Sequence, residues 1–117
     1  MRKTREAKAR ARLVEDAAPV FAALGDPLRL RLVRRLAEEG PLSITRLTEG
    51  TDVTRQAITK HLHSLEGVGL VVMSKAGRET AWELRPVRFD HARAYLDLVS
   101  SRWDDALAAL KDLVETE

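Results

Sequence analysis

Residues 54–69, TRQAITKHLHSLEGVG, combine hydrogen-bonding side chains with an apolar stripe. Ile58, Leu62 and Leu65 recur at intervals of four and three residues, which places them on one face of a helix. The opposite face then carries side chains that can bond base edges or phosphates: Thr54, Arg55, Gln56, Thr59, Lys60 and His63. Arg can pair in bidentate fashion with guanine and Gln with adenine. The pattern favours a DNA-reading helix, although an ordinary amphipathic surface helix has the same periodicity.

A second basic segment follows this helix. Residues 70–73 and 80–84 are rich in strand-forming side chains and flank a Lys75-Ala76-Gly77-Arg78 sequence with a turn at Ala76-Gly77. Two such runs around a glycine-containing turn predict a β-hairpin. Lys75 and Arg78 would then lie near its tip, where they could meet phosphates or an adjacent minor groove.

Three elements are expected to position the reading helix. Asp26-Pro27 is a helix start, with Asp as N-cap and Pro at the first helical position. Leu28, Leu32 and Leu36 follow as an apolar stripe that Leu30 and Ala37 would widen, and Gly40-Pro41 ends the helix. A short helix over residues 44–49 and a turn at residues 50–52 come next. Two short helices joined by a glycine-containing turn are typical of a helix-turn-helix motif.

The N-terminal segment is basic. Residues 1–12 contain six Lys or Arg and one Glu, which predicts a basic arm that is helical or frayed. Residues 16–19 then lead into a separate short core helix over residues 20–24. The arm would add nonspecific attraction to an anionic partner or pack at a dimer interface.

The C-terminal segment predicts one long helix from Phe89 to about Glu115. Its apolar residues recur at alternating intervals of three and four, an unbroken heptad seam: Phe89, Ala92, Leu96, Val99, Trp103, Ala106, Leu110 and Leu113. A soluble monomer avoids such a large exposed patch, so a homodimer is expected, with Phe21 joining the seam. The alternative is a monomer in which the seam folds back over Phe21 and Leu24.

Composition limits the remaining possibilities. The 117 residues fit one small domain, and the absence of cysteine excludes disulfides and thiolate metal sites. No apolar run approaches the ~20 residues of a membrane span, and the N-terminus lacks the apolar stretch of a signal peptide. A cytoplasmic protein with no membrane association is therefore expected. Charge is polarised, since residues 88–117 contain four basic and seven acidic groups.

Residues 20–85 closely resemble the ArsR/SmtB family of winged helix-turn-helix regulators. The resemblance rests on FAALGDPLRLRLVRRLAEEGPLSITRL at residues 21–47, VTRQAITKHLHSLEGVGLV at residues 53–71 and KAGRETAWEL at residues 75–84. It implies a mainly α fold with a small β-hairpin, and a dimer interface formed by the first and last helices. It also implies binding of double-stranded DNA at palindromic operators, through the reading helix and the Lys75 and Arg78 wing.

Metal sensing and catalysis find little support in the residues. The family's cysteine-containing site would lie in SITRLTEG, which has no cysteine, and its C-terminal site uses more histidines than His91 alone. A transition-metal site normally needs three or four ligands. We therefore expect no metal site and no cofactor, and the sequence identifies no effector. Neither a phosphate-binding glycine loop nor a nucleophile motif is present, so no enzymatic activity is expected.

The sequence thus predicts a basic arm (residues 1–15), a winged helix-turn-helix DNA-binding domain (residues 16–86) and a dimerisation helix (residues 87–117). The expected function is that of a metal-independent transcriptional repressor that binds its operator as a homodimer. Two alternatives remain open. One is a metal-responsive sensor with ligands on the C-terminal helix, and the other is a winged-helix interaction module that does not bind DNA.

Overall fold

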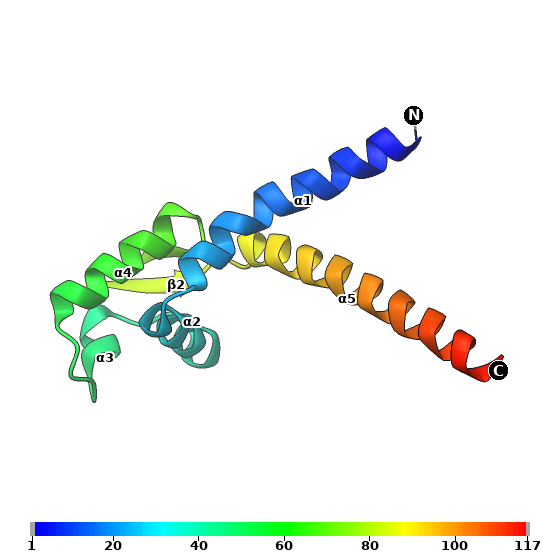
Figure 1. The fold of residues 1–117 in the computed structure, drawn as a ribbon. Helices are drawn as coiled ribbons and strands as arrows, with labels where there is room; N and C mark the ends of the chain where they lie inside the picture. The colour runs from blue at the N-terminus through cyan, green and yellow to red at the C-terminus, as the bar shows by residue number, and fades with distance from the viewer. Residues whose placement is uncertain (1, 117) are drawn as a thin grey trace.

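The computed structural model of the chain describes residues 2–116 as five helices and one β-hairpin (Figure 1). The elements follow in the order α1 (Arg2–Leu24), α2 (Pro27–Glu39), α3 (Ile44–Thr48), α4 (Arg55–Gly67), β1 (Val71–Ala76), β2 (Glu79–Leu84) and α5 (Pro86–Glu115). The predicted fold class, mainly α with a small hairpin after a helix-turn-helix, is confirmed. The long C-terminal helix begins at Pro86 rather than Phe89, because proline is well accommodated in the first turn of a helix.

The core lies beneath α4. Ile58, Leu62 and Leu65, the predicted apolar stripe, have no exposed surface. They belong to one cluster with Leu32 and Leu36 of α2, Trp82 of β2 and residues of α1, β1 and α5. Because this stripe is fixed inside, the opposite face of α4 must point to solvent.

Helix α2 starts as predicted but buries a narrower stripe. The Asp26 side chain accepts hydrogen bonds from the backbone amides of Leu28 (2.9 Å) and Arg29 (3.1 Å). These hydrogen bonds to the charged carboxylate hold the pKa of Asp26 below its ordinary value, and the bond from the Arg29 amide has the largest effect. The expectation that Leu30 and Ala37 widen the buried stripe is wrong, since Leu30 is 50% exposed and Ala37 is also exposed. Only Leu32 and Leu36 of α2 are fully buried, and Val33 packs against the core at the edge of this stripe.

Helix α1 corrects the prediction of an arm followed by a separate short helix. It runs without interruption through Pro19, so the predicted boundary after residue 15 falls inside it. Pro19 is exposed, and its missing N–H removes a single bond of the helix. Ala17 and Val20, each 1% exposed, anchor the flanking turns in the core. Burial here outweighs the local preference of proline to end a helix.

The hairpin is tied to the helix-turn-helix motif. β1 and β2 pair from Val71↔Leu84 to Ala76↔Glu79, which leaves a two-residue turn at Gly77-Arg78. Gly77 has a φ of +69°, a conformation that glycine adopts without strain. Leu42, just before α3, exchanges both backbone hydrogen bonds with Trp82 at 3.0 and 2.8 Å. The wing and α3 are thereby held in a fixed relation.

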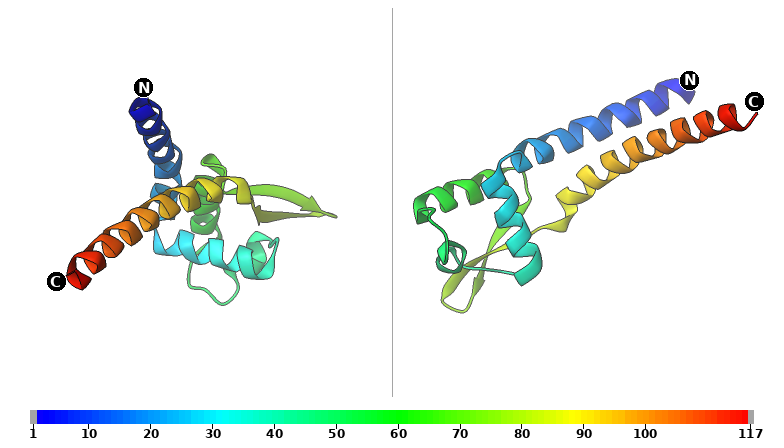
Figure 2. Two further views of the ribbon diagram at one scale, coloured as in Figure 1. Left: turned by 90° about the vertical axis from the view of Figure 1, so that its right-hand side faces the viewer. Right: turned by 60° about the horizontal axis from the view of Figure 1, so that its bottom comes forward.

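Helices α1 and α5 form two long arms that leave the body on the side away from α3 (Figures 1 and 2). Near the body they contact each other, and the Phe21 and Tyr95 rings meet edge to face with centroids 5.8 Å apart. Ala92 is only 7% exposed within this core. It therefore has little surface left for the partner contact that the heptad seam predicts. No helix among residues 2–116 is both long and apolar enough to cross a membrane.

Candidate nucleic-acid interface

The N-terminus of α4 is set by Thr54. Its side-chain oxygen accepts a hydrogen bond from the backbone amide of Ala57 at 3.1 Å, as an N-cap does. The helix therefore begins at Arg55, and both Arg55 and Gln56 lie exposed in its first turn. The first turn of such a helix is the part that reaches base edges when a helix-turn-helix motif docks in a major groove.

The polar face of α4 consists of the following predicted residues: Arg55, Gln56, Thr59, Lys60 and His63. All are exposed except Thr59, which is half-buried. The Thr59 hydroxyl donates to the Arg55 carbonyl at 2.8 Å, so its proton serves the helix itself. Thr59 can contact DNA only through its methyl group or an oxygen lone pair.

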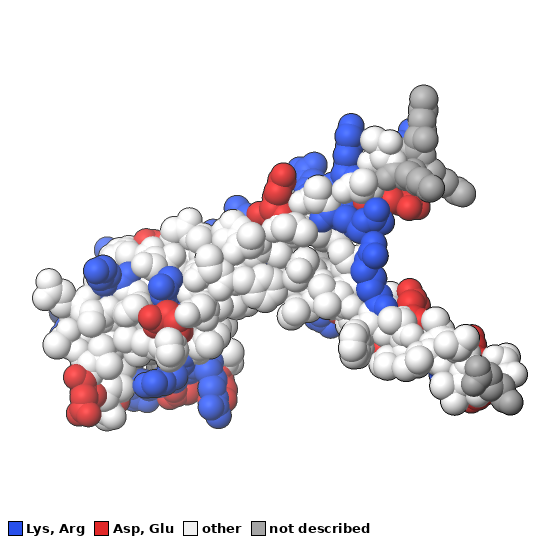
Figure 3. All heavy atoms as spheres, in the orientation of Figure 1, with Lys and Arg blue, Asp and Glu red and all other residues white. Residues whose placement is uncertain are grey.

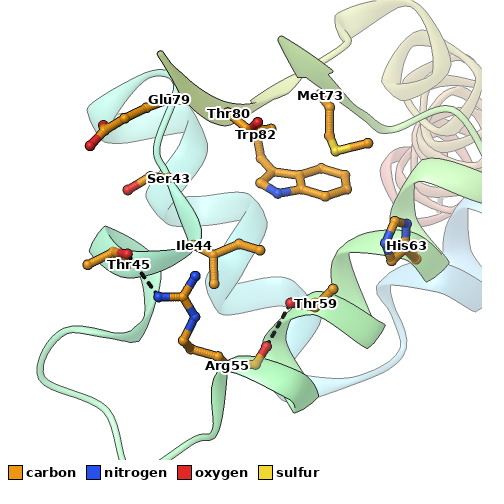
Figure 4. A pocket seen from close by; sticks show the side chains of 10 residues that line it. All are labelled: Ser43, Ile44, Thr45, Arg55, Thr59, His63, Met73, Glu79, Thr80 and Trp82. Carbon is orange, nitrogen blue, oxygen red and sulfur yellow. Dashed lines mark hydrogen bonds between the residues drawn. The ribbon is translucent and has the colours of Figure 1, made fainter. Parts of the chain in front are cut away.

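A groove of about 410 Å³ separates this face from the wing (Figure 4). Arg55, Thr59 and His63 line one wall, and hairpin residues such as Met73 and Thr80 line the other. Ser43 and Thr45 at the start of α3 close one end. The sequence did not indicate that Ser43, Thr45 and Thr80 belong to this site, because nothing in their local spacing shows that they lie next to α4.

His63 has partners within the protein. Its Nδ1 lies 3.1 Å from a carboxylate oxygen of Glu66, one turn along α4. Its ring meets Trp82 edge to face, with centroids 5.4 Å apart. The side chain nevertheless remains 53% exposed. His63 thus links α4 to the wing and still offers one ring nitrogen to solvent or a phosphate.

The wing carries the two remaining predicted residues. Lys75 lies in β1 opposite Thr80, one pair before the end of the strand, and Arg78 is the second residue of the turn. Both side chains are exposed. The hairpin projects from the body (Figure 2), so its tip can reach a surface that extends past α4.

Charge is distributed unevenly over the molecule. Lys and Arg side chains gather along the α1 arm and the lower edge of the body, with Asp and Glu among them, whereas the α5 arm is largely uncharged on the face shown, with Asp and Glu at its margins (Figure 3). Among residues 2–116, no three His, Cys, Asp or Glu side chains meet in an arrangement that could hold a metal ion.

A helix-turn-helix domain family matches residues 24–74, which run from the end of α1 into the wing. An ArsR-like transcriptional regulator from Rhodococcus sp. RHA1 has a similar structure, with a TM-score of 0.69 and 34% identity. The match covers 85% of this chain and 92% of that one. The chain belongs to the ArsR family of transcriptional regulators.

Curated relatives agree with this assignment. This ArsR-family chain is 34% identical to an HTH-type transcriptional regulator of Mycobacterium tuberculosis, across 83% of its own length and 87% of the relative's. It is 32% identical to an uncharacterized HTH-type transcriptional regulator of Methanocaldococcus jannaschii, across 73% and 92%. The relatives are transcription regulators and not enzymes, which confirms the non-enzymatic prediction. The helix-turn-helix motif is the DNA-binding domain of this family.

Proposed function

We propose that the protein is a repressor that binds a palindromic operator as a homodimer. In this proposal, the α4 helices of the two protomers enter successive major grooves, about 34–36 Å apart. Arg55 and Gln56 bond base edges, while Thr54, Thr59, Lys60 and His63 contact edges or phosphates. Lys75 and Arg78 of the wing hold the flanking backbone. The bound dimer represses by occupying the promoter.

One observation carries the DNA-binding mode: α4 is divided into a fully buried stripe and an exposed polar face. Ile58, Leu62 and Leu65 leave no surface for any other partner. Arg55, Gln56 and Lys60 are all exposed, and Arg55 also lines the groove between α4 and the wing. A helix that served only as a scaffold would not need these side chains together.

The part of α5 beyond Ala92 supports the dimer. Five large apolar residues of its seam stay exposed in the single chain: Leu96 (53%), Val99 (46%), Trp103 (66%), Leu110 (57%) and Leu113 (64%). They continue one face of a helix that projects beyond the body (Figure 2). A second copy would offer the same apolar seam, and the two would bury each other as in a coiled coil. Ala106 lies on the same seam, Phe89 begins the seam near the body, and Phe21 of α1 joins it there.

The experiment is a mobility-shift titration in a series of salt concentrations. The probes are the DNA upstream of the protein's own gene and a scrambled duplex of equal length and composition. Parallel lanes contain Zn²⁺ or EDTA. The proposal expects tight binding to the first duplex, weaker binding to the second, and a steep loss of affinity with salt as counterions are released.

Each other outcome favours a different function. Binding that requires Zn²⁺, or is abolished by it, supports a metal-responsive sensor. A protein that binds neither duplex even at low salt is not a DNA-binding regulator of this mode, and the interaction-module alternative then takes its place. If the protein binds both duplexes with equal affinity, binding sites are selected from a random DNA library instead. A protein that selects no sequence from this library does not bind DNA in a sequence-specific manner.

Lys75→Ala is expected to weaken binding to all DNA sequences by a similar factor. A phosphate contact is independent of sequence, and losing it lowers the salt slope by about one per contact removed. The measurement is the affinity for the upstream and scrambled duplexes at several salt concentrations. Lys111→Ala is the matched control, because it removes the same charge from α5, far along the chain from the wing. A loss confined to the upstream duplex would assign Lys75 to base reading instead.

A further inference from the structure

The guanidinium group of Arg55 is bonded to the neighbouring helix. Its Nη1 donates a hydrogen bond to the hydroxyl oxygen of Thr45 in α3, with a distance of 3.1 Å (Figure 4). Arg55 is the first residue of α4 and its side chain is exposed, so it would otherwise sample many rotamers. The bond to Thr45 favours those rotamers that keep the guanidinium at the edge of the groove between α4 and the wing.

Thr45 is itself held in place. The Ser43 side chain caps α3 by accepting from the Arg46 amide at 3.2 Å. At the other end of α3, Arg35 of α2 donates from Nη1 to the carbonyls of Arg46 (3.2 Å) and Leu47 (3.3 Å). Leu47 is buried, at 1% exposure, and anchors the short helix in the core. The hydroxyl of Thr45 therefore belongs to a fixed element and not to a mobile loop.

We propose that Thr45 is a positioning residue that orients Arg55 for reading DNA, an inference that rests on the proposed function. A guanidinium has five N–H donors, and the bond to Thr45 uses one, on Nη1. The donors of Nε and Nη2 remain free, and they form the planar fork that pairs in bidentate fashion with guanine O6 and N7. An arginine held in this way loses less conformational freedom when it binds a base.

Loss of the Thr45 hydroxyl should change the affinity for specific and for nonspecific DNA differently. Without the Thr45 hydroxyl, Arg55 keeps its charge and still attracts phosphates. Only its orientation toward a base is lost. Affinity for the preferred sequence should fall, while affinity for scrambled DNA should hold, and a general loss of stability would lower both.

The test compares Thr45→Val, which is nearly isosteric but lacks the hydroxyl, with Thr45→Ser, which keeps it. The probes are a duplex selected from a random library by the wild-type protein and a scrambled duplex of the same composition. Thr45→Val is expected to lower affinity for the selected duplex about tenfold and to leave the scrambled one unchanged. Thr45→Ser should restore the preference. Thr48→Val is the matched control, because the Thr48 hydroxyl donates only to the Thr45 backbone carbonyl.

A double-mutant cycle with Arg55→Ala completes the test. In that background, Thr45→Val should cause no further loss, because the side chain that it positions is gone. Thermal melting of each variant checks folding, and Thr45→Ala replaces Thr45→Val if valine disturbs α3. A loss that persists with Arg55→Ala, an equal loss on both duplexes, or tighter binding by Thr45→Val overturns the inference. A wild-type protein that selects no sequence overturns the proposed function and this inference together, whereas selection that survives Thr45→Val unchanged overturns the inference alone.

Discussion

Trp103→Glu is expected to convert the protein from a dimer to a monomer and to lower its affinity for the operator by about 100-fold or more. In the single chain Trp103 is 66% exposed, so the protomer itself should fold normally with a charge there. In the proposed dimer the same position lies in the centre of the seam, where an unpaired carboxylate would lose its hydration. A monomer binds only one half-site, so it loses the gain in affinity that comes from binding two linked half-sites at once.

Sedimentation and the mobility shift measure the two effects on the same samples. Ser101→Glu is the matched control, because it introduces the same charge two residues away, on the opposite side of the helix from the seam. It should leave the dimer and its affinity unchanged. If Trp103→Glu remains dimeric, the partner contact lies elsewhere, and the cavity lined by Val14, Phe21 and Tyr95 between the arms becomes the next surface to test. If the Trp103→Glu and Ser101→Glu proteins are both dimers and only one of them binds DNA, α5 contributes to DNA binding by a route other than dimerisation.

The sequence predicted those features that depend on local spacing. The buried stripe of Ile58, Leu62 and Leu65 follows from the period of an α-helix, and the Asp26 cap follows from side-chain chemistry. The hairpin follows from the change of period around Gly77. Each of these signals lies within about a dozen residues, where neighbours in sequence are neighbours in space.

Features that depend on tertiary packing were not predicted. Continuity of α1 through Pro19 depends on the burial of Ala17 and Val20 by other elements, which no local rule anticipates. The bond between Thr45 and Arg55 joins residues ten positions apart on two helices, and it depends on the angle at which those helices cross. The polar face of α4 was thus visible in the sequence, whereas the contacts that orient it were not.

Gln56→Ala is expected to relax the base preference of the protein and to weaken operator binding by about 1–3 kcal/mol, which corresponds to roughly fivefold to 150-fold. Gln56 is exposed in the first turn of α4 and has no net charge, so its loss should not affect attraction to phosphates. Selection of binding sites from a random library measures the change directly. One position of each half-site should lose its preference, while affinity for scrambled DNA stays the same.

Arg55→Lys extends this argument to the neighbouring residue. Lysine keeps the positive charge but has no planar fork, so bidentate pairing with a base is lost while attraction to phosphates remains. The variant should lose preference at a different base from Gln56→Ala, because the two side chains lie about 100° apart around the helix. Changes at the same base would mean that the two residues read it jointly. Equal losses on operator and scrambled DNA for Gln56→Ala would remove Gln56 from base reading, since a side chain that reads sequence must discriminate between sequences.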